Sequence, residues 1–276
     1  ITDEGRDCLS DLLTMLILPC NIFLSFEGNT DMSALKSSLL TVIISVLVML
    51  CTAILGKVIY RHREERKAKV FRYGLVNSNA LFIGLPIIQS LLGDAGVLQL
   101  SMYMIFVRMF CWSYGLSLYT GVKSDWKGSF KRLLTHPCMI AAALGVAAMV
   151  TGIRLPAFLD RTLQYVSSCL MALSMLLIGV VLSEIKLKEV FRGDVWRFTA
   201  LRLGVMPGIV FGLCKLCGVP YIVTATCTLV SGMPAASLTA VLAARYHGDS
   251  ELGALLVAVS TILSAVTIPL WFMILQ

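Results

Sequence analysis

Charged residues are scarce in this chain. Only 14% of its 276 residues are Asp, Glu, Lys or Arg, against about 25% in an average soluble domain. Hydrophobic residues make up 58% of the chain, and its mean hydropathy is +0.85. A water-soluble fold of this size cannot bury so much apolar surface, which excludes soluble enzymes, nucleic-acid-binding modules and disordered chains. Continuous apolar runs of roughly twenty residues, without the alternation of a β-barrel strand, predict an all-α integral membrane protein.

Residues that carry catalysis or bind metals are also few. The chain has three histidines, which lie near the ends of apolar runs and do not cluster: His62, His136 and His247. Its nine cysteines lie mostly inside apolar runs, where a thiol behaves as a small hydrophobe. The pair Cys214 and Cys217 lacks the further ligands that a metal or redox site needs. We therefore expect no catalytic residues, no metal site and no cofactor, and we do not expect an enzyme.

Nine apolar spans follow one another with short connections, and they cover residues 9–26, 38–60, 70–92, 97–121, 136–153, 158–183, 197–217, 220–245 and 252–275. Alternate connections hold sixteen Lys and Arg residues on one side and four on the other. By the positive-inside rule, the side that includes residues 61–69 is cytoplasmic. The basic residues therefore indicate orientation rather than a nucleic-acid partner. We expect a multi-pass protein of the inner (plasma) membrane with Gln276 outside.

Two spans carry the same interruption near their middles, Gly84 with Pro86 and Gly232 with Pro234. Proline removes a helical hydrogen bond, and glycine lets the backbone bend. The two prolines are 148 residues apart, and a shift by this number places most spans of the second half on those of the first. The sequence thus predicts two inverted five-helix repeats with crossed broken helices. The first helix of the first repeat would precede Ile1 and is missing from this chain.

The expected repeats divide the chain into three parts. Residues 1–121 form the first repeat, residues 122–135 a cytoplasmic linker and residues 136–276 the second repeat. Inverted repeats with interrupted helices are a signature of secondary transporters.

The two expected breaks place polar groups at mid-depth. Each second half-helix directs unpaired N–H groups and the positive end of its dipole to the crossing, which favours an anion. The carbonyls that end the first half-helices are suited to a cation or to donors of the substrate. Asn77 and Asn79 are candidate substrate-binding residues, with capping or bonding to a neighbouring helix as the alternative. Further candidate substrate-binding residues are Ser231, Gly84, Pro86, Gly232 and Pro234, although small polar residues such as Ser231 also allow helices to pack closely.

Arg108 is a charged residue deep in a span. It lies about twelve residues from either end of the span 97–121, roughly 18 Å, which is too far for its side chain to snorkel. No Asp or Glu lies as deep in any span. We expect its guanidinium to bind a substrate carboxylate bidentately, with helix carbonyls as the alternative partner. Arg202 lies nearer the cytoplasmic end of its span and is expected to snorkel.

These motifs resemble those of the auxin efflux carrier family, which includes the plant PIN carriers and many bacterial members. The run Asn-Ser-Asn-Ala-Leu-Phe-Ile-Gly-Leu-Pro at 77–86 is similar to the family's fourth-helix motif. The runs at 231–236 and 243–246 are similar to its ninth-helix motif, and the closing run at 260–270 is also similar. The resemblance covers essentially the whole chain.

The resemblance implies a scaffold part, residues 9–26 and 136–183, that forms a homodimer. It also implies a transport part, residues 38–121 and 197–276, that holds the crossed helices. Asn79, Pro86 and Pro234 match site or crossover positions of the family, and Arg108 falls where plant carriers have a glutamine. This difference favours a more anionic substrate than auxin, and bacterial relatives are associated with dicarboxylates such as malate and malonate.

We therefore expect a secondary active or facilitative transporter that moves a small organic anion, a carboxylate, across a prokaryotic inner membrane by alternating access. Its expected partners are the substrate, the lipid bilayer and a second copy of the chain. One alternative is a sodium-coupled symporter of an acidic amphiphile with the architecture of the bile-acid symporters. The other is a non-transporting membrane sensor.

Overall fold

The computed structural model describes residues 3–27, 32–120, 135, 137–153, 155–183, 192–246 and 248–276. Every regular element within these ranges is a helix. Among the described residues, four helices are long and apolar enough to cross a membrane: Lys36–Ile59, Leu85–Arg108, Gly193–Leu216 and Ser250–Leu275. These findings confirm an all-helical chain suited to a membrane, whereas the count of nine spans and the inversion of the repeats stay predictions.

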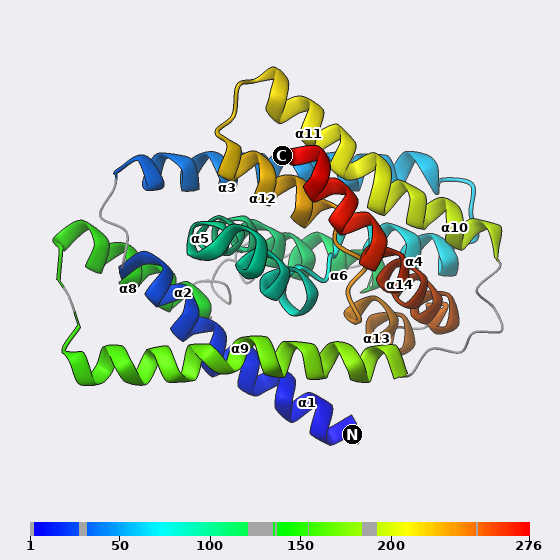
Figure 1. Ribbon diagram of the computed structural model, residues 1–276. Helices are drawn as coiled ribbons and strands as arrows, with labels where there is room; N and C mark the ends of the chain where they lie inside the picture. Colours follow the sequence, from blue (N-terminus) through cyan, green and yellow to red (C-terminus); the bar gives the residue numbers. More distant parts are fainter. Residues whose placement is uncertain are drawn as a thin grey trace.

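One group of helices comes from the start and the middle of the chain. Its members are α1 (Asp3–Leu12), the π-helix η1 (Leu13–Ile17), α2 (Leu18–Glu27), α8 (Pro137–Thr151) and α9 (Ala157–Ser183). Helix α2 packs on α8 and α9, and α9 runs along one side of the molecule in Figure 1. A hydrogen bond of 2.7 Å from Asn21 Nδ2 to Ser167 Oγ joins α2 to α9.

The other helices form the second group, which presents one order of elements twice: a long helix, a broken helix and another long helix. The first series is α3 (Met32–Ile59), α4 (Glu65–Val76) with η2 (Ala80–Gly84), and α5 (Leu85–Phe110), continued by η3 (Cys111–Gly115) and α6 (Leu116–Thr120). The second series is α10 (Gly193–Ala200), η5 (Leu201–Val205) and α11 (Met206–Leu216), then α12 (Tyr221–Ser231) with α13 (Leu238–Arg245), then α14 (Ser250–Leu275).

Helix α5 contains a kink at Gly93. This residue has φ 63° and ψ −158°, a backbone conformation that only glycine adopts readily. The kink separates the short segment that follows η2 from the longer segment that carries Tyr103.

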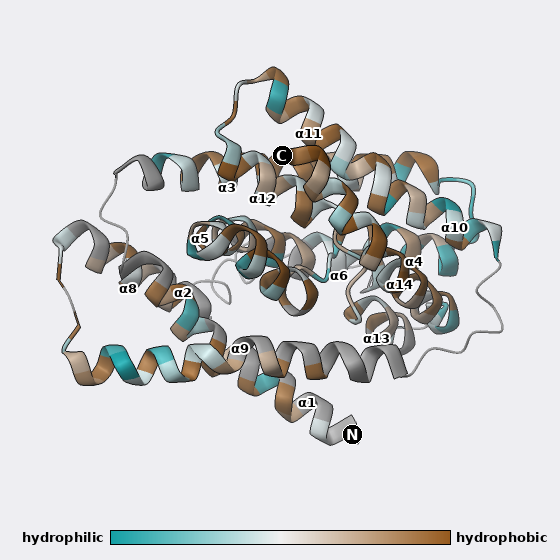
Figure 2. Cartoon of the chain, in the orientation of Figure 1, coloured by the Kyte–Doolittle hydropathy of each residue, from teal (hydrophilic) through white to brown (hydrophobic). Residues whose placement is uncertain are grey.

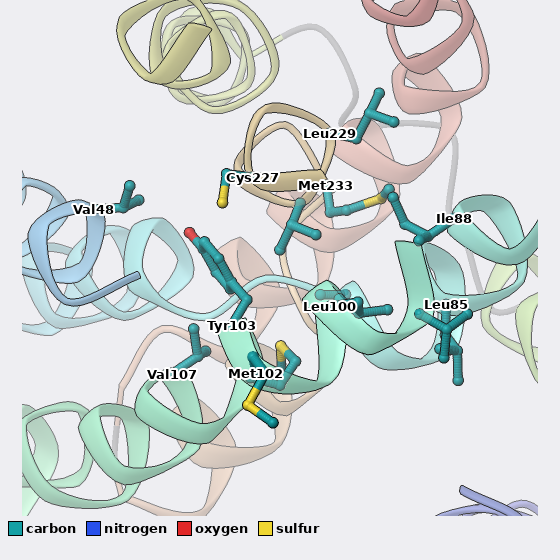
Figure 3. Close-up of a cluster of buried hydrophobic side chains, with 14 of the residues drawn as sticks. Val48, Leu85, Ile88, Leu100, Met102, Tyr103, Val107, Cys227, Leu229 and Met233 are labelled. Atoms are coloured by element: carbon teal, nitrogen blue, oxygen red, sulfur yellow. The ribbon is translucent and has the colours of Figure 1, made fainter. Parts of the chain in front are cut away.

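The core of the second group lies between α3, α5 and α12. Figure 3 shows Tyr103 of α5 lying between Val48 of α3 and Cys227 of α12. Leu100 and Cys227 are fully buried, and Tyr103 is 1% exposed. This packing brings α3 and the longer segment of α5 against the first half of the second broken helix.

Large hydrophobic side chains also cover part of the outside. On α3 they recur at helical spacing along one face, at Leu39, Ile43, Leu47, Leu50, Ile54 and Val58. Figure 2 shows hydrophobic residues along α3, α11 and α14, and hydrophilic residues at the turn after α3 and near α10. An apolar stripe of this length on the surface indicates contact with lipid rather than water.

Candidate substrate site at the crossing of two broken helices

The two breaks in the helices meet and pair. Between α4 and η2, Ser78 lies opposite Ala235 of the break between α12 and α13 in a short antiparallel bridge. The N–H of Asn79 donates to the Pro234 carbonyl over 2.8 Å, and the N–H of Ala236 donates to the Asn77 carbonyl over 3.1 Å. The breaks that the sequence predicted therefore cross and bind each other through their backbones.

The first break does not lie at Pro86, and that expectation was wrong. The helix is interrupted at residues 77–79, and Pro86 is in the first turn of α5, which continues directly from η2. In η2 the N–H groups of Ile83 and Gly84 both donate to the Asn79 carbonyl, each over 3.2 Å. This wider π turn relieves the clash between a proline ring and the preceding turn, so the helix passes through Pro86 unbroken. Pro234, in contrast, lies inside the second break, as predicted.

The two candidate asparagines differ in their partners. Asn77 Nδ2 donates to the hydroxyl of Tyr73, one turn earlier, over 3.0 Å. Asn79 is 4% exposed, and its side chain does not cap η2. A largely buried amide that is not used as a helix cap can donate to a ligand, so Asn79 is the better candidate for binding a substrate.

The two candidate glycines allow close approach. A Cβ on Gly84 would lie 3.3 Å from Cγ of Met233, and a Cβ on Gly232 would lie 3.2 Å from Cγ of Pro207. Ser231 donates its hydroxyl to the carbonyl of Thr228 on its own helix over 2.8 Å. These three residues shape the backbone of the crossing, and a direct contact of any of them with substrate stays a prediction.

Arg202 lies at the crossing, which contradicts the expectation that it snorkels. Its side chain is 2% exposed. Its Nε donates to the Met233 carbonyl over 2.9 Å, and its Nη1 donates to the Leu75 carbonyl. The guanidinium is thus directed inward because each first half-helix presents carbonyl oxygens that lack helical partners. The signal in the sequence was a lone arginine inside an apolar run. Its position along the span alone led to the wrong expectation for its side chain.

Ser260 of α14 also supports the crossing. Its hydroxyl accepts a hydrogen bond of 3.1 Å from the N–H of Ala235 and donates one of 2.6 Å to the Leu256 carbonyl. In the sequence this residue stood within the closing run that resembles the family. The structure shows a bond that satisfies a backbone N–H inside the second break.

Further buried hydroxyls lie on the helices beside the crossing. Within the part of the chain that the structure describes, the side-chain oxygens of Tyr103, Thr226 and Thr228 are buried without a hydrogen-bond partner. Figure 3 shows the Tyr103 hydroxyl directed to the space between Val48 and Cys227. Arg108, on the same helix as Tyr103, is half-buried, and its contact with substrate stays a prediction.

A family model described as "Membrane transport protein" matches residues 1–128 and 126–272, almost the whole chain. The chain belongs to this family. It is the auxin efflux carrier-like family, so the resemblance seen in the motifs is confirmed. Membership indicates a transporter rather than an enzyme, as predicted.

Two relatives align with this membrane transport protein over nearly its full length. It is 26% identical over 286 residues to an uncharacterized transporter of Methanocaldococcus jannaschii, covering 98% of this chain and 90% of the relative. It is also 26% identical over 279 residues to an uncharacterized transporter of Methanothermobacter thermautotrophicus, covering 99% of this chain and 90% of the relative. Both relatives are thus similar over the crossing and its flanking helices.

Proposed function

We propose that this protein is a secondary transporter of small carboxylate anions, which bind at the crossing of the broken helices. The observation that carries the proposal is the side chain of Asn79. Its side chain is 4% exposed at the start of η2, next to the paired breaks, and it does not cap that helix. An amide in this position is suited to donate to a carboxylate oxygen.

The charge around the crossing supports an anion. Neither break contains an Asp or Glu, and η2, α12 and α13 contain none either. Two helical segments, η2 and α13, begin at the crossing, where their first N–H groups and positive dipole ends favour negative charge. A carboxylate is therefore the substrate group that this site stabilises best, and dicarboxylates such as malate and malonate are the leading class by family resemblance.

The arrangement of elements supports transport by alternating access. The order of long helix, broken helix and long helix occurs twice in the second group, as in two inverted repeats with the substrate site between them. The separate group of α1, α2, α8 and α9 is the proposed scaffold and homodimer interface. The second group then moves against this scaffold with the bound anion.

Binding of carboxylates to the purified protein tests the proposal. Asn79→Ala should weaken the binding of malonate or malate by about tenfold or more, because one hydrogen bond to a charged group contributes roughly 1.5–3 kcal/mol. Ser90→Ala is the matched control, since Ser90 donates only to the Ile87 carbonyl on the exposed side of the same helix. Isothermal titration calorimetry measures both variants. Equal affinities in Asn79→Ala and the wild type, or equal uptake of the uncharged diamides by proteoliposomes, would contradict the proposal.

A further inference from the structure

The two carbonyls that bind Arg202 end the first halves of both broken helices. Leu75 is in the last turn of α4, and Met233 lies in the break directly after α12. Carbonyl oxygens at such ends have no helical donor and carry the negative end of the helix dipole. One guanidinium therefore joins two half-helices that are far apart in sequence and neutralises part of the negative potential of both.

Oxygens of this kind are the usual ligands of a coupling cation. In transporters with broken helices, unwound carbonyls and the carboxyl ends of half-helices coordinate sodium. In this chain two such oxygens are already bound by the side chain of Arg202. A sodium ion at this place would lose both ligands and would meet a fixed charge of its own sign.

The charge of Arg202 has no carboxylate partner among the described residues. The described residues show no ion pair for Arg202, and its neighbours Leu201, Leu203 and Gly204 are apolar. The nearest acidic residue along its own helical rod is Asp194, near the start of α10. Arginine keeps its charge in such surroundings, so the crossing holds a permanent cation whose partners are carbonyl dipoles.

We propose that Arg202 is a built-in cation that takes the place of a coupling sodium ion at the crossing, so that this carrier needs no sodium there. The statement about transport rests on the proposed function. The statement about the cation site does not, because it is tested without any substrate. A protein with this built-in cation differs from the sodium-coupled symporter that the sequence left as an alternative.

Thermal unfolding of the purified protein tests the cation site. The wild type should give the same Tm in sodium, lithium and choline chloride at equal ionic strength. Arg202→Ala should lower the Tm by roughly 10 °C, as expected for the loss of a buried charged partner. In this variant, sodium, lithium or methylguanidinium should raise the Tm by on the order of 3 °C relative to choline, when the cation is present at about tenfold excess over its Kd. The increase in Tm should saturate with cation concentration.

Two further variants make the result specific. Arg197→Ala removes an exposed arginine from the same rod of helices and should change neither the Tm nor its response to cations. Arg202→Lys keeps the charge without the fork that reaches both carbonyls. It should have an intermediate Tm and no response to sodium, and it remains informative if Arg202→Ala does not fold. A sodium-specific Tm increase in the wild type or in Arg202→Lys would overturn the proposal, and so would an Arg202→Ala variant that responds to no small cation.

Uptake by proteoliposomes provides the separate test of coupling. If carboxylates are substrates, their uptake by the wild type should be the same in sodium and choline buffers. Sodium-dependent uptake would overturn the built-in cation. Absence of carboxylate uptake combined with the predicted thermal results would contradict the proposed substrate alone.

Discussion

Arg108 occupies a half-buried position in an apolar part of α5, between Val107 and Met109. If its guanidinium binds the substrate carboxylate, Arg108→Gln should weaken the binding of malonate by more than tenfold, because losing one member of a buried charged pair costs about 2–5 kcal/mol. The Tm should change little. Titration calorimetry on the purified variant gives the affinity, with Arg161→Gln, an exposed arginine of α9, as the control. An unchanged affinity would show that Arg108 is a structural residue.

Single residues show clearly where inference from the sequence succeeds and where it ends. Asn79 was singled out because an amide next to a break in an apolar span needs a partner, and the structure places it at the crossing while its contact with substrate stays a prediction. Ser260 was not identified as a ligand of the crossing because its bond is to the backbone of Ala235, and backbone acceptors leave no trace in a sequence. Arg202 was misinterpreted for the same reason, since both of its partners are main-chain carbonyls.

Among the elements, α14 supports the second break through one hydroxyl. Ser260→Ala would leave the N–H of Ala235 buried without an acceptor, which costs about 1–3 kcal/mol. Ser264, one turn later on the same helix, is equally buried but donates only to the Thr261 carbonyl. Ser264→Ala should therefore cost less than Ser260→Ala, and only Ser260→Ala should weaken substrate binding. Unfolding by denaturant compares the two, and equal effects would contradict this role of Ser260.

The kink inside α5 depends on one glycine. Gly93→Ala should destabilise the protein by about 1–3 kcal/mol, because φ 63° with ψ −158° is strained for any residue with a Cβ, although nothing lies within 4 Å of the added atom. Gly204→Ala is the matched control, since it also has open space around it but lies within the helical segment η5. It should be neutral or stabilising by up to about 1 kcal/mol. Thermal unfolding of both variants measures the difference, and a Gly93→Ala variant as stable as the wild type would contradict the role of this backbone conformation.

The sequence predicted the existence of the two broken helices better than it predicted the residues at which they break. A glycine and a proline two residues apart mark a departure from α-helical geometry, and at Pro234 this departure is the break itself. Before Pro86 it is a π turn, while the chain breaks at residues 77–79. The difference depends on pairing with the other half of the chain, because Asn79 binds the Pro234 carbonyl and so fixes where α4 ends. Sequence pattern within one span does not contain that information.

At the scale of the whole molecule, the turn after α3 and helix α10, which are distant in sequence, lie at one end of the second group. Tyr60, in the turn after α3, stacks on Phe71 with ring centroids 4.6 Å apart, and Phe71 lies 6.0 Å from Phe198 of α10. The turn after α3 and the start of α10 therefore share an end (Figure 1). The same two connections were assigned to one side of the membrane from their Lys and Arg content alone.

The position of α14 bears on the side of the membrane at which Gln276 lies. Tyr246, just before α14, lies 6.3 Å from Tyr119 of α6, whose chain leads into the expected cytoplasmic linker. Helix α14 has 26 residues, about 39 Å at 1.5 Å per residue, which exceeds the roughly 30 Å apolar core of a bilayer. If α14 spans the membrane, its end at Gln276 must lie on the side opposite to its start.

Labelling of single cysteines tests this orientation in intact cells. In a background with the nine native cysteines replaced, Gln276→Cys should react with a membrane-impermeant maleimide added from outside, and Glu64→Cys should not. Both positions should react after the membrane is permeabilised, which shows that each thiol is accessible. The expected asymmetry follows from the positive-inside rule, because the connection with Glu64 carries a dense group of basic residues whose transfer across the bilayer is unfavourable. Labelling of Glu64→Cys but not of Gln276→Cys in intact cells would reverse the assigned orientation, and would place the start of α14 outside.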